Sequence, residues 1–359
     1  MTGEHSRPRT KVAFVYPNSR LQLAAEVAAG TGADSGLLGQ NHLAEFGYEA
    51  FIHEPRIRAV SESGGLAHRV RWNVRELIIP WELRDADLVV TSLFNLLPIA
   101  ARLHRRPRTV VLDFALATVL DRRRGWSRRI LVRSLRSAGA IVCLSENQRA
   151  RLLDRLDVSP DRVHTVLLGI DHQFLRPNAG TTGGEGDYVL AVGKDLARDY
   201  RTLAQSASSI DAKFVVVTEE RNVRGIDLPP NVEVRRGLTY GELRDLYARA
   251  RCVVLPLRRP DYPFGTESGG LTALMEAMAV GKPVVASDRP IIHEYTRADE
   301  SALIVPPEEP SALAAAIARL LSDDALAARL GVAARQRIDE HHTMRQFTQG
   351  LAAVLDRLA

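Results

Sequence analysis

The segment Phe264-Gly-Thr-Glu-Ser-Gly-Gly-Leu-Thr-Ala-Leu-Met-Glu-Ala-Met-Ala-Val-Gly-Lys-Pro-Val-Val-Ala-Ser-Asp288 runs from a glycine-rich loop into a predicted helix and then, after Gly-Lys-Pro, into a short predicted strand. Backbone N–H groups at the start of a helix attract phosphate. Glu276 lies further along the same helix between apolar neighbours, where a carboxylate is costly unless it is paired or hydrogen-bonded. A ribose diol can supply such hydrogen bonds, so the segment predicts a site for a nucleoside diphosphate.

Apolar runs of strand length alternate with amphipathic stretches along the rest of the chain, which predicts parallel sheets covered by helices. The predicted strands form two series: 12–16, 88–91, 109–112 and 140–144, followed by 188–192, 214–218, 252–255, 284–287 and 302–305. Two series indicate two doubly wound domains of the α/β class. Because ligands of such sheets bind outside the carboxyl ends of the strands, we expect the site in the cleft between the domains.

The predicted boundary between the domains is the stretch 176–187, which is rich in Gly, Pro and Thr and poor in apolar residues. We therefore expect an N-terminal domain over 1–175. A linker over 176–187 and a nucleotide-binding C-terminal domain over 188–342 would follow. The last predicted element is a helix over 343–359.

Size and composition exclude several classes of protein. A chain of 359 residues can form two domains, and 45% hydrophobic with 25% charged residues is typical of a globular protein. The net charge of +5 comes without a basic tail, so no nucleic-acid partner is expected. Cys143 and Cys252 lie inside apolar runs, which favours buried thiols in a reducing compartment. Because the N-terminus is polar and no apolar run approaches the roughly 20 residues that span a bilayer, we expect a cytoplasmic protein.

The segment 264–288 resembles the donor-binding motif of the family 4 retaining glycosyltransferases, which runs Glu, seven residues, Glu, then Ala-Met-Ala-x-Gly-x-Pro-Val. The segment 168–177, Leu-Gly-Ile-Asp-His-Gln-Phe-Leu-Arg-Pro, is similar to the family's Gly-Ile-Asp-x-x-x-Phe-x-Pro domain junction. The resemblance implies the GT-B fold, in which two Rossmann-like domains face each other across a cleft and the C-terminal helix crosses back to the N-terminal domain. It also implies sugar transfer with retention from a UDP- or GDP-linked donor, without a metal ion or other cofactor.

Glu276 matches the second Glu of the family motif, which the resemblance assigns to the ribose hydroxyls. The first Glu would fall at Ser268, whereas Glu267 is one residue out of register. Either Glu267 reaches the sugar in a rearranged loop, or Ser268 and the four amides after it bind the donor. Those amides belong to Gly269, Gly270, Leu271 and Thr272.

A second predicted part of the donor site follows the strand 188–192. Gly193 lets the backbone approach a ligand closely, and Lys194 and Arg198 place two cations at the turn into the next helix. Cations at a helix N-terminus oppose the helix dipole, which favours an anion beside them. The resemblance assigns both cations to the departing diphosphate, and it assigns the backbone near Leu238 to the nucleobase.

The N-terminal half supplies further candidates. The segment 35–48 resembles the family's glycine-rich loop and following helix, so Gly36 and Gly39 are expected at a helix start that meets the diphosphate. Asp113 follows the strand 109–112, where the family often has a His. A carboxylate there can contact a sugar hydroxyl or an acceptor amine, act as a general base, or cap the next helix.

The segment 122–136 is predicted to form a basic amphipathic helix. Its Trp126, Ile130 and Leu131 either contact an anionic membrane at its inner face or pack on the core with the arginines in solvent. Asp85-Ala-Asp87 matches a metal-binding signature but directly precedes an apolar strand, and no Cys/His set has metal-ligand spacing. No metal site is therefore expected.

The resemblance therefore implies a hexosyltransferase-like glycosyltransferase that moves a sugar from a nucleoside-diphosphate sugar to a small-molecule, glycan or lipid-linked acceptor. It also implies that the N-terminal domain, 1–175, binds this acceptor. Two alternatives stay open. A GT-B-type nucleotide-sugar epimerase would need paired acid and base residues, and a non-catalytic nucleotide-sugar-binding protein would suit the displaced Glu. An inverting reaction also stays open if Asp113 acts as a base.

Overall fold

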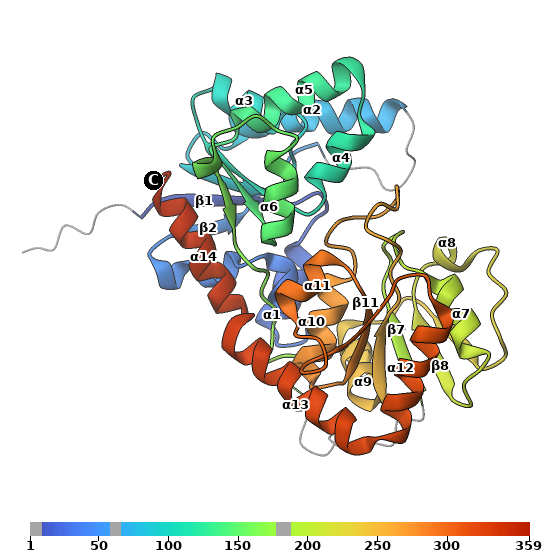
Figure 1. Ribbon diagram of the computed structural model, residues 1–359. Helices are drawn as coiled ribbons and strands as arrows, with labels where there is room; N and C mark the ends of the chain where they lie inside the picture. Colours follow the sequence, from blue (N-terminus) through green and yellow to red (C-terminus); the bar gives the residue numbers. More distant parts are fainter. Residues whose placement is uncertain (1–8, 58–65, 177–187) are drawn as a thin grey trace, which may run out of the picture. The chain divides into compact units, whose positions relative to one another are not determined.

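The computed structural model describes residues 9–57, 66–176 and 188–359 (Figure 1). The chain forms two compact units. Unit 1 consists of Met1–Ala25, Asp34–Gly169 and Met344–Ala359, and unit 2 consists of Glu26–Ala33 and Ile170–Thr343. The predicted linker 176–187 lies outside the described residues except for its first residue, so its role stays a prediction.

Unit 1 is built on a sheet of six parallel strands in the order β2-β1-β3-β4-β5-β6. The strands are β1 (Lys11–Val15), β2 (Glu49–Ile52), β3 (Leu88–Thr91), β4 (Arg108–Asp113), β5 (Ala140–Cys143) and β6 (Val163–Thr165). The α-helices are α2 (Leu66–Glu82), α3 (Leu97–Leu103), α4 (Leu116–Arg122), α5 (Gly125–Ser137), α6 (Glu146–Leu153) and α14 (Met344–Asp356), while α1 (Leu21–Ala28) spans a boundary between the units. The 3₁₀ helices are η1 (Asp34–Leu37), η2 (Gln40–Phe46) and η3 (Pro160–Arg162).

Unit 2 contains a second sheet of six parallel strands in the order β12-β11-β10-β7-β8-β9. The strands are β7 (Tyr188–Val192), β8 (Lys213–Val217), β9 (Val232–Arg235), β10 (Cys252–Leu255), β11 (Val284–Ser287) and β12 (Leu303–Val305). The helices are α7 (Tyr200–Ala207), α8 (Glu220–Val223), α9 (Tyr240–Arg249), α10 (Leu271–Val280), α11 (Pro290–Tyr295), α12 (Pro310–Ser322) and α13 (Asp324–His341). The strand order reverses between β7 and β10, and doubly wound sheets bind ligands beyond the carboxyl ends of strands at such a point.

The predicted parallel α/β architecture is confirmed in both units. β3, β5, β10 and β11 are buried along their whole length, as the continuous apolar runs indicate for strands covered on both faces. Cys143 and Cys252 are buried free cysteines within these strands. β2, β6 and β9 are absent from the two predicted series of strands, because each lies at a sheet edge and, apart from Val163 of β6, none of their residues is fully buried.

The helix predicted within 35–48 is wrong in kind, because this part of the chain forms the 3₁₀ helices η1 and η2. Gly39 and Gly47 flank η2 with φ angles of 83° and 85°, a left-handed conformation that confines this helix to seven residues. Gly39 also leaves room for α14, since a β-carbon there would lie 2.5 Å from Oγ1 of Thr348. The glycine is therefore explained by packing within unit 1.

The C-terminal helix α14 packs on η2 in unit 1. Arg345 of α14 donates to Glu45 at 3.1 Å, and the Tyr48 hydroxyl donates to Asp356 near the other end of the helix. Phe347 is buried beneath it. The helix that ends the sequence thus completes the core of the unit in which the sequence begins.

The basic segment 122–136 is divided between two helices. Arg122 ends α4, and α5 begins at Gly125. Trp126 is 76% exposed, but Leu131 is fully buried in the core of unit 1, so the expectation that both side chains can meet one membrane surface is wrong. No helix in the described residues is long and apolar enough to span a bilayer.

In unit 2, α13 closely approaches the C-terminal end of α10. A β-carbon at Gly331 in α13 would lie 2.2 Å from the carbonyl oxygen of Gly281, the residue that caps α10. Arg335, one turn further along α13, donates to the carbonyl of Ala279. This contact fixes the end of the helix that carries Glu276.

Gly331→Ala should therefore destabilise the protein, because the new β-carbon would meet a backbone oxygen at 2.2 Å. Overpacking of this kind costs about 1–3 kcal/mol, so the melting temperature should fall by several degrees. Gly241→Ala in α9 is the matched control, since no atom lies within 4 Å of its β-carbon. That change should be neutral or slightly stabilising. Equal melting temperatures for the two variants would contradict the contact.

Candidate functional site

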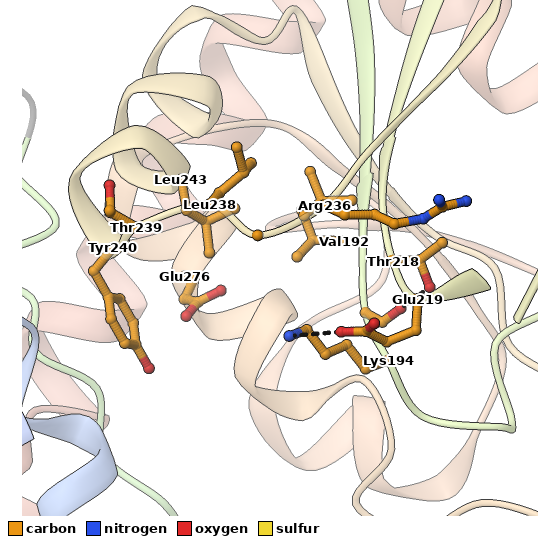
Figure 2. A pocket seen from close by; sticks show the side chains of 13 residues that line it. Val192, Lys194, Thr218, Glu219, Arg236, Leu238, Thr239, Tyr240, Leu243 and Glu276 are labelled. Carbon is orange, nitrogen blue, oxygen red and sulfur yellow. Dashed lines mark hydrogen bonds and ion pairs between the residues drawn. The ribbon is translucent and has the colours of Figure 1, made fainter. Parts of the chain in front are cut away.

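A pocket of about 230 Å³ lies at the carboxyl ends of β7, β8 and β9 in unit 2 (Figure 2). It is lined by Val192, Gly193, Lys194, Val217, Thr218, Glu219, Arg236, Gly237, Leu238, Thr239, Tyr240, Leu243 and Glu276. The structure therefore brings together four of the predicted donor-site residues, which are Gly193, Lys194, Leu238 and Glu276. The pocket lies entirely within unit 2.

Glu276 reaches the pocket from α10 and is buried. Burial raises the pKa of its carboxyl from 4.5 to about 7, while a hydrogen bond from Tyr247 and the charge of Arg198 both oppose the rise. The carboxyl therefore holds its proton more tightly than an ordinary glutamate does. Any ligand that donates hydrogen bonds to it favours the ionised form.

Tyr247 is a site residue that the sequence pattern does not reveal. It lies on the buried face of α9, where burial raises the pKa of its phenol well above the ordinary value. Its hydroxyl donates to Oε2 of Glu276 at 2.9 Å. No local signal in the sequence distinguishes this buried tyrosine from an ordinary core residue. Tyr247 orients the carboxylate from behind the pocket.

Lys194 follows β7 and lies at the pocket with its ammonium group in solvent. Its Nζ lies 2.9 Å from Oε1 of Glu219, which follows β8. The hydrogen bond and the charge of Lys194 lower the pKa of Glu219. In Figure 2 this pair lies across the pocket from Glu276. Because both partners are exposed, their attraction is weak enough for an anionic ligand to replace Glu219.

Arg198 is buried next to the same turn and does not line the pocket. A β-carbon at Gly193 would lie 2.1 Å from its Nε, and one at Gly270 would lie 3.4 Å from its Nη1. The guanidinium thus occupies space that two glycines leave open. Among the described residues, no side chain or backbone group accepts a hydrogen bond from its Nε or Nη1. A buried guanidinium with unused donors is strongly unfavourable unless an anion binds it.

Asp195 joins the turn after β7 to the glycine-rich loop before α10. Its carboxylate accepts from the Thr266 amide at 3.0 Å and from the Thr266 hydroxyl at 2.9 Å. It also accepts from the Ala197 amide at 2.8 Å. Asp199 caps α7 by accepting a hydrogen bond from the Thr202 amide at 3.1 Å. Neither carboxylate was predicted to have a role, although both flank the predicted cations in sequence.

The predicted residues of the glycine-rich loop occupy different environments. Glu267 is buried, and Gly270 caps α10 with a φ angle of 96°. The amides of Gly269 and Leu271 donate to the carbonyls of Thr266 and Ser268, so in this conformation both are engaged within the loop. Thr272 is exposed in the first turn of α10. None of the predicted loop residues lines the pocket, and their roles stay predictions.

The candidates in unit 1 have structural partners. Asp113 is fully buried, and its carboxylate accepts from the Leu116 amide at 2.7 Å at the start of α4. This is the capping arrangement that stood as the alternative to a catalytic role. A β-carbon at Gly36 would lie 2.6 Å from the Leu23 side chain, so this glycine allows close packing on α1.

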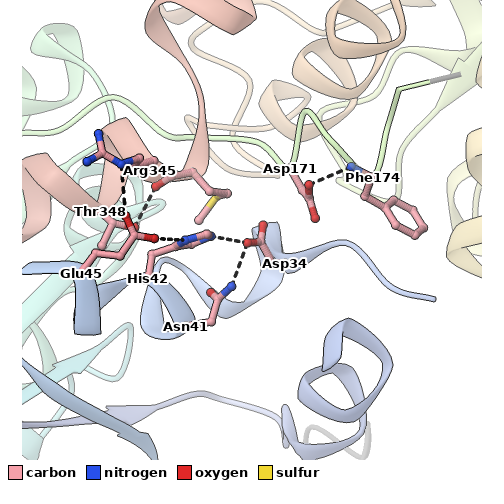
Figure 3. A network of polar contacts seen from close by, with 9 residues as sticks. Asp34, Asn41, His42, Glu45, Asp171, Phe174, Arg345 and Thr348 are labelled. Carbon is pink, nitrogen blue, oxygen red and sulfur yellow. Dashed lines mark hydrogen bonds and ion pairs between the residues drawn. The ribbon is translucent and has the colours of Figure 1, made fainter. Parts of the chain in front are cut away.

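A polar network links η1, η2 and α14 within unit 1 (Figure 3). Nε2 of His42 lies 2.5 Å from Asp34, and its Nδ1 lies 3.4 Å from Glu45. Asn41 donates to Asp34, and Arg345 donates to Glu45. The hydrogen bond to Asp34 is the main reason why the pKa of His42 is raised. Both ring nitrogens of His42 thus face carboxylates, and the network connects η1, η2 and α14 within unit 1.

Among the described residues, no group of His, Cys, Asp and Glu side chains is arranged to hold a metal ion. Asp87 of the Asp85-Ala-Asp87 segment instead accepts from the Lys11 amide at 3.0 Å at the start of the sheet.

Two family models match the chain. The model described as Glycosyltransferase Family 4 matches residues 21–174, and the model described as Glycosyl transferases group 1 matches residues 208–337. Together the two matches extend over most of the described residues. The first falls mainly in unit 1 and the second lies in unit 2.

Two curated relatives are similar over part of their length. The MMP alpha-(1->4)-mannosyltransferase of Mycolicibacterium hassiacum is 25% identical over 63% of this chain and 56% of its own. The D-inositol 3-phosphate glycosyltransferase of Salinispora arenicola is 28% identical over 55% of this chain and 50% of its own. The chain thus spans about half the length of these relatives.

Solved structures share the fold. Sucrose-phosphate synthase from Thermosynechococcus elongatus superposes with a TM-score of 0.76 at 18% identity, over 98% of this chain and 99% of that one. HepE from Anabaena, solved in complex with UDP and glucose, superposes with a TM-score of 0.71 at 14% identity, over 97% of this chain and 100% of that one. Identities this low show the fold alone, which is GT-B. The two family models, which match 21–174 and 208–337, show that the chain belongs to the family 4 glycosyltransferases, also described as glycosyl transferases group 1.

Proposed function

We propose that the protein transfers a sugar from a nucleoside-diphosphate donor, bound in the pocket of unit 2, to an acceptor. The observation that carries the proposal is a buried carboxylate, Glu276, and a buried guanidinium, Arg198, held beside one pocket with Lys194 at its mouth. A ribose diol and a diphosphate supply the hydrogen-bond donors and the negative charge that these groups lack. The apolar side chains of Leu238 and Leu243 give the pocket a wall on which a nucleobase can lie.

In the proposed reaction, a hydroxyl oxygen of the acceptor forms a bond to the anomeric carbon while the bond from that carbon to the diphosphate breaks. The bonding electrons leave with the nucleoside diphosphate, and the acceptor proton passes to a phosphate oxygen. Lys194 and Arg198 stabilise the negative charge that develops, which is the task a metal ion performs in other enzymes. Attack from the face that the diphosphate leaves retains the anomeric configuration and requires no protein nucleophile.

The reaction is tested by incubating the protein with UDP-, GDP- and dTDP-sugars and following the products by NMR. Slow hydrolysis to the nucleoside diphosphate, with release of the sugar in its original anomeric form, is the expected result. Interconversion of two sugar nucleotides would instead identify an epimerase, and tight binding with no turnover would identify a binding protein. Either of these outcomes would overturn the proposed transferase activity.

Nucleotide affinity should depend on the ionisation of Glu276. A diol prefers the carboxylate, and a pKa near 7 makes the carboxylate scarce in the empty pocket below neutral pH. The affinity for UDP or GDP, measured by calorimetry, should fall toward tenfold per pH unit below about pH 7. Tyr247→Phe removes a hydrogen bond that lowers this pKa, so the midpoint should move to higher pH. Tyr188→Phe is the control, because the Tyr188 hydroxyl donates to the Leu246 carbonyl instead.

Glu276→Gln should abolish the dependence of nucleotide affinity on the ionisation of residue 276 and leave only the titration of the phosphate.

The raised pKa of Glu276 also contributes to the stability of the fold, fully below about pH 4.5 and progressively less as the pH rises through 7. A rise from 4.5 to about 7 corresponds to roughly 3 kcal/mol. Glu276→Gln should therefore raise the melting temperature more at about pH 8 than at about pH 5. An equal change in melting temperature at both pH values would show that the pKa of Glu276 is not raised by folding.

Arg198→Met should separate stability from binding. The change removes a buried charge with unused donors, so at about pH 6 the empty protein should melt no lower than the original. The affinity for UDP or GDP should fall at least tenfold, about 1.4 kcal/mol, while the affinity for the bare nucleoside changes little. Arg201→Met, on the exposed side of α7, is the matched control. Unchanged diphosphate affinity in a folded Arg198→Met protein would rule out the anion site.

A further inference from the structure

One end of unit 1 combines exposed apolar side chains with arginines. Trp81 near the end of α2 is 59% exposed, and Leu103 at the end of α3 is 77% exposed. The rings of Trp81 and His104 meet edge to face with centroids 6.2 Å apart, so the two helix ends lie side by side. The guanidinium of Arg84 lies 4.7 Å from the centre of the Trp81 ring.

The apolar pair lies beside a strongly basic turn. The segment 102–108 reads Arg-Leu-His-Arg-Arg-Pro-Arg and contains no acidic residue. We call the surface formed by these groups the Trp81 tip, and its residues are Trp81, Arg84, Arg102, Leu103, Arg105 and Arg106, all of them exposed.

The acidic residues next to the Trp81 tip do not cancel its charge. Glu82 is engaged by His53, at 2.9 Å, and points away from solvent. Asp87 accepts from the Lys11 amide and lies only 3.8 Å from one of the four arginines of the tip, Arg106. Asp85 is the remaining exposed acid in this turn. The tip therefore keeps a clear positive excess around its two apolar side chains.

Packing explains why these apolar side chains face outward. α3 lies between α2 and α5, against which it buries Leu97, Ala100 and Ala101. Leu103 lies in the last turn of α3, where its side chain is exposed to solvent. On α2, Val74, Leu77 and Trp81 are all exposed at a spacing of one helical face. The apolar stripe of α2 thus leads to the tip and lies on the surface of the protein.

We propose that the Trp81 tip docks on the surface of an anionic phospholipid bilayer. Tryptophan favours the level of the lipid headgroups, where its ring meets acyl chains and its N–H meets water. Arginines around it would pair with lipid phosphates and place the charge in the region where the surface potential is strongest. The exposed apolar side chains of the tip lie among arginines, which suits an anionic lipid surface, whereas the core of a stable protein interface is depleted of charged residues.

This contact differs from the one predicted for 122–136. In α5, Leu131 is buried and Trp126 lies at the opposite end of its helix from Arg136, which pairs with Asp157 at 2.7 Å. In the tip, by contrast, the aromatic ring is in contact with both a guanidinium and the neighbouring helix end. The tip is independent of the proposed sugar transfer, since none of its residues belongs to the pocket of unit 2.

The test is co-sedimentation of the full chain with vesicles at low ionic strength. Vesicles of phosphatidylcholine with about a third phosphatidylglycerol should bind the protein, and pure phosphatidylcholine should not. The double change Trp81→Ser and Leu103→Ser should lower the partition coefficient at least tenfold. The double change Arg105→Gln and Arg106→Gln should do the same and should weaken the dependence on salt. Melting temperatures of all variants should match the original, because these side chains are exposed.

Val332→Ser is the matched control, since Val332 is an equally exposed apolar residue on α13 of unit 2. It should bind vesicles like the original protein. Absence of binding to the anionic vesicles would overturn the proposal. The proposal would also be overturned if Trp126→Ser abolished vesicle binding while the variants of the Trp81 tip bound normally, since the membrane contact would then lie on α5. Binding that responds to the arginines but ignores Trp81 and Leu103 would show electrostatic adsorption without docking and would also overturn it.

Discussion

The donor site depends on keeping two ionisable side chains, Glu276 and Arg198, out of water within one α/β unit. The sheet alone provides no partner for either side chain. The carboxylate needs a hydrogen-bond donor from a neighbouring helix, which Tyr247 supplies, and the guanidinium needs a backbone without a β-carbon, which Gly193 supplies. The turn that holds the guanidinium is in turn fastened by Asp195 to the loop before α10. Parallel strands that end at one edge bring all these pieces within reach of each other.

Burial of these charges links the stability of the empty protein to its affinity for ligand. A group that lacks a partner in the empty state gains one when a ligand arrives, so the unfavourable burial is relieved by binding. Glu276 and Arg198 also reduce each other's cost, because the positive charge favours the ionised carboxylate. By contrast, Lys194 is solvated and has Glu219 as a partner, so its contribution is more easily replaced. Because Arg198 is buried and Lys194 is exposed, we expect a diphosphate to depend more strongly on Arg198.

The sequence was sufficient for the architecture and for part of the site. Continuous apolar runs specify strands covered on both faces, and the register of Glu276 on an apolar helix marks a carboxylate with a special partner. The sequence did not reveal that Tyr247 binds Glu276, because this contact forms only when α9 packs on α10. A tyrosine that will be buried has no local signature in the sequence. The capping contact of Asp113 likewise depends on where α4 begins, and the need for a glycine at position 39 depends on the packing of α14. Local pattern therefore predicts elements, whereas packing decides their partners.

The position of α14 in the chain has a consequence for biosynthesis. Unit 1 begins with the first strand but is completed by the last helix, since Thr348 fills the space beside Gly39. A ribosome therefore releases every strand of both sheets before it makes the final helix of unit 1, and unit 2 can finish folding first. A fragment that stops at residue 169 would expose the apolar surface that α14 covers. In a circular permutant that places Met344–Asp356 ahead of β1, this helix would be synthesised together with the rest of unit 1.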